Sequence, residues 1–230
     1  MVIGNGMIAK RFETYQDKNQ FVIFASGVSN SKSTNDDEYK RETELLQTTI
    51  ATNKEKTIVY FSTCNIYDPS ENKSKYVSHK KKIEKYIINS KCNYYIFRVS
   101  NAVGKSKNPN TILNFFVYHI LNKINFDLWY NATRNLIDVD DIYQIIHFIL
   151  QGNLFPNQII NIANPTNYSV RDIVTHIEDF RKIKATYSKI KKGCSFDIDI
   201  SLIEPIIQRI PIQFGEDYVS RLLQKNYDLK

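Results

Sequence analysis

The first half of the chain alternates short apolar runs with longer segments in which apolar and polar positions recur at helical spacing. Four apolar runs, rich in Val, Ile, Tyr and Phe, predict buried strands at residues 1–3, 20–25, 57–62 and 94–99. Two longer segments predict helices at residues 36–52 and 76–90, and the first opens with acidic residues that suit a helix N-terminus. Because strands alternate with helices, the pattern predicts parallel βαβ units in a doubly wound α/β sheet.

The pattern is less regular after residue 104, where helices and short strands follow one another without a repeat. Helices are expected at about 111–122, up to residue 150, at 169–180 and at 217–224, with strands at 126–130 and 158–163. We therefore predict a core over residues 1–105 and, over residues 106–230, a small substrate-binding cap interleaved with the core. Ligands of such sheets bind at the edge where the carboxyl ends of the strands meet, so the site is expected there.

A turn that contains two glycines follows the first strand. Residues 4–9 form a G-x-G-x-x-A pattern, and the helix behind it is expected to extend to about Tyr15. Glycines in such a turn let the backbone approach a pyrophosphate held at the helix N-terminus, so the pattern favours dinucleotide binding. A tight turn that merely requires small residues is the alternative.

Groups capable of proton transfer follow the strand at 57–62. This strand ends in Ser62 and Thr63, and the next predicted helix carries Tyr76 and Lys80 one turn apart on the same face. A tyrosine is a poor general base at neutral pH, but a nearby cation favours the phenolate and makes acid–base catalysis feasible. The three hydroxyls and the ammonium are therefore candidates for one active site.

The Tyr-x-x-x-Lys spacing occurs twice, and only its context separates the two matches. Tyr187 and Lys191 repeat the spacing, but only Tyr76 follows a hydrophobic strand that ends in Ser-Thr. A solvated helix face around residues 80–82 is the alternative for the first match.

The composition of the 230-residue chain narrows the class of protein. Hydrophobic residues make up 42% of the chain, which indicates a folded globule rather than disorder. No apolar run reaches the length of a membrane span and no signal-peptide pattern is present, so we expect a cytoplasmic protein without a membrane partner. Cys64, Cys92 and Cys194 show no metal-ligand spacing, so no metal site is expected and the thiols are expected to be reduced.

The chain is basic, with a formal net charge of +7 from 31 basic and 24 acidic residues. Such a charge attracts phosphates, nucleic acids and anionic surfaces. The basic runs at 80–82 and 189–192 lack the interleaved aromatic residues expected of a nucleic-acid surface. Solvated surfaces are the favoured interpretation, and nucleic-acid binding is the weakest of the alternatives that stay open.

The order of these motifs resembles that of the extended short-chain dehydrogenase/reductase family that modifies nucleotide sugars, which comprises 4-epimerases, 4,6-dehydratases and 4-ketoreductases. Residues 61–67 resemble its F-S-[ST]-x-x-V-Y segment, and residues 98–104 resemble its R-x-x-N-x-Y-G segment. Residues 134–141 resemble R-x-F-I-H-V-x-D, and residues 161–170 resemble Y-N-I-G followed by S-V. Together with the glycine turn and the Tyr-Lys pair, these weak motifs cover most of the chain.

The resemblance implies a Rossmann-like fold and a role for each matched residue. The implied catalytic residues are Thr63, Tyr76 and Lys80. The residues implied to bind a cofactor, NADP or NAD, are Gly4, Asn5, Gly6, Met7, Ile8, Ala25, Ser26, Gly27, Ser62, Tyr76 and Lys80. The residues implied to bind the substrate, a nucleotide sugar, are Asn65, Arg98, Asn101 and Arg134. A homodimer through the helices at 36–52 and 76–90 is implied in the same way.

The chain departs from the family pattern at two places. A family member has two further strand–helix units between the glycine turn and the strand at 20–25, whereas here only residues 10–19 intervene. The sheet is thus expected to be shortened, and the group that binds the adenosine ribose is either lost or supplied by the loop at 26–32. Cys64 and Asn65 stand where a dehydratase has an acid and a base, which disfavours dehydration.

The leading hypothesis is NAD(P)-dependent oxidoreduction of a nucleotide sugar, by 4-ketoreduction or epimerisation in surface polysaccharide biosynthesis. In a reduction, Tyr76 would donate a proton to the carbonyl oxygen, Thr63 would hold that oxygen, and Lys80 would hold the cofactor ribose. The alternative is a non-catalytic binding or regulatory protein on a decayed reductase fold, which the lost strands motivate.

Overall fold

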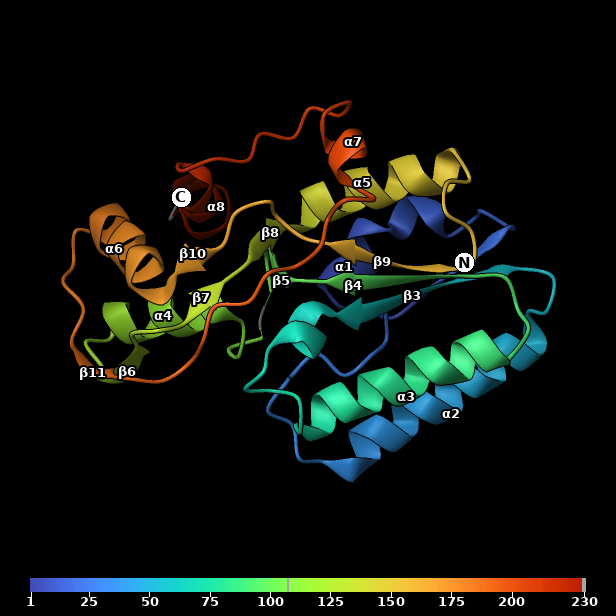
Figure 1. Ribbon diagram of the computed structural model, residues 1–230, viewed down its shortest axis with the longest axis horizontal. Coiled ribbons are helices and arrows are strands. Elements are labelled where there is room, and N and C mark those ends of the chain that lie inside the picture. The colour runs from blue at the N-terminus through green and yellow to red at the C-terminus, as the bar shows by residue number, and fades with distance from the viewer. Residues whose placement is uncertain (107, 229–230) are drawn as a thin grey trace.

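A five-stranded parallel sheet forms the centre of the computed structural model, which describes residues 1–106 and 108–228 (Figure 1). Its strands stand side by side in the order β1 (Val2–Ile3), β2 (Phe21–Phe24), β3 (Thr57–Thr63), β4 (Tyr94–Val99) and β9 (Gln158–Ile162). Each lies within one or two residues of a strand expected from an apolar run. The predicted α/β class with a parallel, Rossmann-like sheet is confirmed.

Helices cover both faces of the sheet because alternate strand residues point to opposite sides. The helices α2 (Asp36–Thr52) and α3 (Lys75–Asn89) lie side by side on one face, where Phe24 and Tyr60 pack against them. On the other face lie α1 (Met7–Arg11) and α5 (Val139–Gln151), packed against the intervening strand residues. The helices of the two faces hold the carboxyl ends of the strands in fixed positions.

Side-chain caps set where α2 and α3 begin. The Asn35 side chain accepts a hydrogen bond from the backbone N–H of Asp37, and the Ser74 hydroxyl accepts one from Val77. Such a cap satisfies a backbone donor that the helix leaves free and stabilises it by about 1 kcal/mol. The cap at Ser74 matters for the site because it places Tyr76 in the first turn of α3.

The amino-terminal half is short, as expected. After α1, a 3₁₀ turn at Glu13–Tyr15 returns the chain directly to β2, and Phe12 and Tyr15 are buried beneath the sheet. The strand β1 is therefore an edge strand, and the Gln16 side chain accepts a hydrogen bond from its Val2 N–H at 2.9 Å. No further strand pairs with this edge in the part of the chain that the structure describes.

A second lobe with its own hydrophobic core stands at the carboxyl side of the sheet (Figure 1). Its helices are α4 (Ile112–Leu121), α6 (Val170–Arg181) and α8 (Tyr218–Tyr227). Its short strands pair as β6 (Phe126–Trp129) with β11 (Tyr187–Ile190) and β7 (Thr133–Arg134) with β10 (Tyr168–Ser169). The predicted division of the chain at residue 105 stays a prediction.

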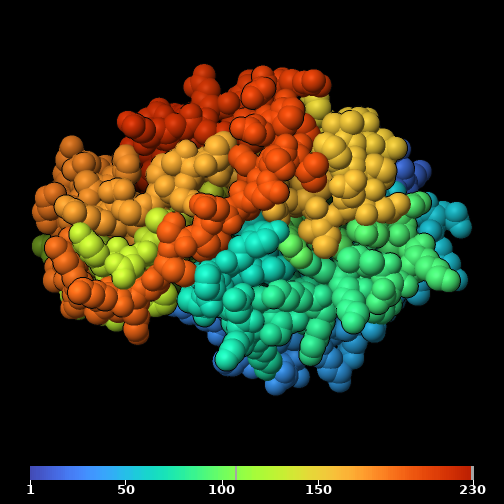
Figure 2. Space-filling model, viewed as in Figure 1, coloured from blue at the N-terminus to red at the C-terminus, as the bar shows by residue number. Residues whose placement is uncertain are grey.

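The chain passes between lobe and core several times. The strands β5 (Asn101–Val103) and β8 (Leu136–Asp138) pair in parallel at their junction, and α5 and β9 then return to the core. After β11 the chain crosses one face of the molecule to α7 (Glu204–Ile207), and Figure 2 shows this orange-red segment lying over both parts. Sequence patterns did not predict β11 or α7. None of the helices within residues 1–106 and 108–228 has the length and apolarity that crossing a bilayer requires.

Candidate active site

A cleft of about 530 Å³ opens at the carboxyl ends of β1, β2, β3 and β4. Its walls come from the glycine turn, the loop after β2, the end of β3, the first turns of α3, the end of β4 and the segment before α4. The predicted site residues that line it are Asn5, Gly6, Met7, Ile8, Ala25, Ser26, Gly27, Ser62, Thr63, Asn65, Tyr76, Lys80 and Asn101. The edge expected from the sheet topology thus contains the cleft.

The glycine turn forms one wall. Gly4 has a φ of +129°, and a Cβ at this position would collide with the carbonyl group of Ala25 in the loop after β2. Gly6 precedes the first residue of α1 and has no heavy atom within 4 Å of where its Cβ would stand. Gly4 therefore permits close packing of two loops, and Gly6 leaves the backbone open to a ligand.

Thr63 and Tyr76 both line the cleft, from neighbouring elements. Thr63 ends β3 and its hydroxyl accepts a hydrogen bond from the N–H of Asn65 at 3.1 Å, which leaves its proton available. Tyr76 lies in the first turn of α3, and its hydroxyl has no hydrogen-bond partner among the described side chains and backbone groups. Both side chains are buried apart from the cleft surface, with 6% and 8% of their area exposed.

Lys80 stands one turn further along α3, with its Nζ 5.8 Å from the centre of the Tyr76 ring. The ammonium donates hydrogen bonds to the Glu42 carboxylate at 3.0 Å and to the Tyr60 hydroxyl at 2.9 Å. It is not the solvated surface lysine of the alternative interpretation, because only 2% of its area is exposed.

Glu42 was not predicted as a site residue. Burial raises its pKa, but the Lys80 ammonium and hydrogen bonds from His79, Tyr60 and the N–H of Val28 lower the pKa more, to well below the usual range. The carboxylate is therefore ionised at neutral pH. The sequence held one signal for it, since an acidic residue stands between Tyr39 and Leu46 on the apolar face of α2.

The charged side chains that line the cleft are basic. Arg41 and Lys80 are the charged side chains among its described lining residues, and no carboxylate lines it there. The Arg41 guanidinium donates hydrogen bonds to the hydroxyl and the carbonyl oxygen of Ser26, at 3.0 and 2.9 Å. Sequence reasoning missed Arg41 because nothing in a helix with mixed charges marks the residue that turns toward a neighbouring loop. The arrangement suits an anionic ligand that extends along the glycine turn.

A family model described as the NAD-dependent epimerase/dehydratase family matches residues 16–163. The chain belongs to the NAD-dependent epimerase/dehydratase family. The matched range holds Thr63, Tyr76 and Lys80, whereas the glycine turn precedes it. A search of curated protein sequences returned no match.

Several solved structures share the fold at low sequence identity. A structure of RMD from Pseudomonas aeruginosa in complex with NADPH has a TM-score of 0.72 and 13% identity, over 97% of this chain and 96% of that chain. The UDP-glucuronic acid 4-epimerase from Bacillus cereus, in complex with UDP-glucuronic acid and NAD, has a TM-score of 0.71 and 18% identity, over 94% and 76%. A UDP-galactose 4-epimerase has a TM-score of 0.74 and 11% identity, over 90% and 77%.

Two arginines expected to bind substrate lie outside the lining of the cleft. Arg98 points from β4 toward α3, where its guanidinium forms two hydrogen bonds with the buried Glu84 carboxylate, at 2.6 and 3.0 Å. Burial lowers the pKa of Arg98, but the hydrogen bonds and the charge of Glu84 raise it more. Arg134 donates to the carbonyl oxygen of its neighbour Thr133 and lies 5.9 Å from the Trp129 ring. The structure therefore does not bring these two arginines to the predicted site.

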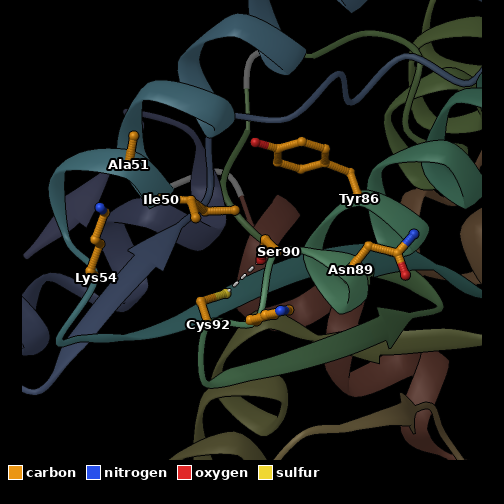
Figure 3. Close-up of a pocket in the computed structure, with 8 residues that line it drawn as sticks. Ile50, Ala51, Lys54, Tyr86, Asn89, Ser90 and Cys92 are labelled. Carbon is orange, nitrogen blue, oxygen red and sulfur yellow. Dashed lines mark hydrogen bonds between the residues drawn. The ribbon is translucent and has the colours of Figure 1, made fainter.

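A second hollow, of about 420 Å³, lies between the carboxyl ends of α2 and α3 (Figure 3). Ile50 and Tyr86 face it from the two helices, and the Ser90 hydroxyl donates a hydrogen bond to the Cys92 sulfur beside it. It contains none of the predicted site residues. No group of three His, Cys, Asp or Glu side chains that could hold a metal occurs in the described part of the chain.

Proposed function

We propose that this family member catalyses NAD(P)-dependent oxidoreduction of a nucleotide sugar, by 4-ketoreduction or epimerisation. The observation that carries the proposal is that Thr63, Tyr76, Lys80 and residues of the glycine turn line one cleft. Polysaccharide biosynthesis is proposed as the setting because nucleotide sugars supply it. Two structural neighbours support the substrate class: one is a UDP-glucuronic acid 4-epimerase in complex with UDP-glucuronic acid and NAD, and the other is a UDP-N-acetylglucosamine 4-epimerase in complex with UDP-N-acetylmuramic acid.

The side chains suggest a division of labour during reduction of a sugar ketone. When bound, the reduced nicotinamide supplies the hydride that the carbonyl carbon accepts. The Tyr76 hydroxyl gives its proton to the carbonyl oxygen, and the Thr63 hydroxyl donates a hydrogen bond to the same oxygen. The positive charge of Lys80 stabilises the phenolate that remains on Tyr76 until solvent returns a proton. Oxidation of the alcohol during epimerisation uses the same groups in reverse.

The shape of the cleft fits the phosphate and nicotinamide portions of a dinucleotide better than its adenosine portion. Gly6 leaves open space beside the turn, and Arg41 and Lys80 supply positive charge. No acidic side chain for the adenosine ribose lines the described part of the cleft. We propose that Ser29 and Ser31 of the loop after β2, which line the cleft, take over part of that role.

The substrate side is proposed to involve Asn65 and Asn101, the two predicted residues that line the cleft beyond the catalytic groups. Asn101 is held by a hydrogen bond from its amide to the carbonyl oxygen of Asn135 at 2.8 Å. Cys64, which directly precedes Asn65, is buried, and its sulfur lies 3.1 Å from the carbonyl oxygen of Arg98. Burial raises the pKa of the Cys64 thiol. A thiol held neutral in this way is a poor acid or base, which supports reduction or epimerisation over dehydration.

The first test is calorimetric titration of NADPH and NADH into the protein, followed by turnover assays with keto-sugar nucleotides. We expect binding of one or both cofactors, and a loss of turnover by orders of magnitude in Tyr76→Phe. The matched control is Tyr187→Phe, because Tyr187 repeats the Tyr-x-x-x-Lys spacing away from the cleft. Binding of neither cofactor would favour the non-catalytic alternative, and normal turnover of Tyr76→Phe would remove Tyr76 from the mechanism.

We also propose that two copies pair along α2 and α3. Tyr86 and Ile88 of α3 are 37% and 43% exposed, which is high for large apolar side chains. Light scattering of the protein and of Ile88→Glu tests this pairing. A dimer that the substitution disrupts is expected, whereas a monomeric wild-type protein would refute the pairing.

A further inference from the structure

Lys80 rests on a carboxylate that has no part in the mechanism above. Glu42 has no exposed area, and its Oε1 accepts hydrogen bonds from the Lys80 Nζ at 3.0 Å and from the Tyr60 hydroxyl at 2.6 Å. The Tyr60 hydroxyl in turn accepts from the same Nζ at 2.9 Å. An ammonium has three protons to donate. Two of them are thus engaged inside the protein, and one remains for the cleft that Lys80 lines.

The other sides of this group are closed. A Cβ at Gly27 would lie 2.7 Å from the Lys80 Nζ and 2.9 Å from the Glu42 Oε1, so the loop after β2 covers both. The second carboxylate oxygen accepts from the N–H of Val28 at 2.7 Å and lies 3.0 Å from the His79 Nε2. These partners hold the Glu42 carboxylate in one place. The Lys80 ammonium, which is bound to that carboxylate and to Tyr60, is therefore held in one position as well.

The charges explain why this position is stable. A buried ammonium is costly unless an opposite charge and hydrogen bonds compensate for its lost hydration. Glu42 supplies that charge from α2, while Lys80 belongs to α3 and Tyr60 to β3, so three separate elements fix one atom. A solvated lysine on a helix surface would instead sample many rotamers.

We propose that Glu42, together with Tyr60, is the positioning residue for Lys80, whose ammonium it directs into the cleft before a ligand binds. The remaining proton would meet a hydroxyl of the cofactor ribose, and this part of the proposal rests on the proposed function. The position of the ammonium itself is a property of the ligand-free protein. The two parts can therefore be tested separately.

The first test measures the reactivity of Lys80 in the ligand-free protein. An amine-reactive acylating reagent is applied at mildly alkaline pH, and labelling is quantified by mass spectrometry relative to the exposed Lys82. In Glu42→Gln the Lys80 Nζ loses its ionic partner and the side chain is no longer held in one position, so we expect labelling of Lys80 to rise about tenfold or more. Glu44→Gln is the matched control, because Glu44 is an exposed residue of the same helix.

Unchanged labelling of Lys80 in folded Glu42→Gln would overturn the proposal. Labelling of Lys225, which is paired with Asp138 and Asp140 in another part of the protein, should stay constant and reports general unfolding. If Glu42→Gln does not fold, Tyr60→Phe decides, since it keeps the charge and removes one of the two hydrogen-bond partners of the ammonium. A smaller rise is expected there, and no change would also overturn the proposal.

Cofactor titration supplies the second readout. A purely structural Glu42 would lower the melting temperature of Glu42→Gln and leave the dissociation constant of the cofactor unchanged in the folded fraction. The proposed role predicts a dissociation constant about tenfold higher or more, with Glu44→Gln binding as the wild-type protein does. If the wild-type protein binds neither cofactor, the proposed function fails, while the labelling result still decides whether Glu42 positions Lys80.

Discussion

Replacing Arg98 by leucine tests whether this residue stabilises the fold or binds the substrate, the role that the sequence motif implied. The guanidinium and the Glu84 carboxylate form a two-point ion pair, and the Glu84 side chain is only 5% exposed. Removing one partner of a buried pair leaves the other charge uncompensated, at a cost of about 3–5 kcal/mol. The Arg98 side chain is still 17% exposed, and the Ser62 hydroxyl also donates a hydrogen bond to Glu84, at 2.5 Å. We therefore expect Arg98→Leu to lower the free energy of unfolding by about 3 kcal/mol, at the lower end of that range.

This cost should lower the free energy of unfolding and leave the affinity for a ligand unchanged. About 3 kcal/mol corresponds to a fall in melting temperature of roughly 6–12 °C for a domain of this size. Urea unfolding followed by circular dichroism would compare Arg98→Leu, Glu84→Gln and the double variant, which should lose less than the sum of the two. Arg171→Leu, at an exposed position of α6, is the control, with an expected change within about 0.5 kcal/mol.

The opposite pattern would refute this reasoning. If Arg98→Leu keeps its stability and instead loses affinity for a nucleotide sugar by more than tenfold, Arg98 leaves Glu84 and reaches the ligand. Calorimetric titration of the same variant with UDP-sugars, in buffer without urea, tests for that outcome.

Three further predictions follow from the geometry of the cleft. Gly4→Ala places a side chain at a φ of +129° and against the carbonyl group of Ala25; we expect a stability loss of about 1–3 kcal/mol in urea unfolding and weaker cofactor binding by calorimetry. Arg41→Ala should weaken cofactor binding and reduce its dependence on salt, measured by titration at several ionic strengths. Folding depresses the pKa of Glu42, so its carboxylate stabilises the fold above the ordinary glutamate pKa of 4.5, and that contribution is lost as the pH falls below this value. The stability difference between wild-type protein and Glu42→Gln, from urea unfolding, should therefore narrow from about pH 5 to about pH 3.

Local patterns were enough to predict the central elements of the fold and to single out the candidate catalytic groups that line one cleft. Strand runs and helix periodicity depend on neighbouring residues, and the i, i+4 spacing of Tyr76 and Lys80 is fixed once α3 forms. The end of β3 then brings Thr63 to the same edge of the sheet. By contrast, β11 was missed because its residues, Tyr187 to Ile190, are largely polar and pair with β6 from far away in the chain.

The side of a strand on which a residue lies explains the outcome for Arg98. Motif matching placed Arg98 at the right position of the chain but did not say where its side chain points. Phe97 and Val99 pack with the core beneath α5, so the pleat directs Arg98 to the opposite face, toward α3. Strand alternation could have indicated this from the sequence, whereas the partner Glu84 became visible only in the tertiary structure.

The shortened amino-terminal half affects the two ends of the cleft differently. The proposed catalytic groups lie on β3 and α3, and β3 pairs with β4 from Ile58 to Thr63, independently of what stands beyond β1. Lys80 is fixed by Glu42 from α2 and Tyr60 from β3, neither of which belongs to the shortened region. Under the proposed function, absence of the outer strands removes contacts for the adenosine portion of a dinucleotide and leaves the proposed reactive end in place. Affinity for the cofactor, and not the rate of the chemical step, is the quantity that this shortening should lower.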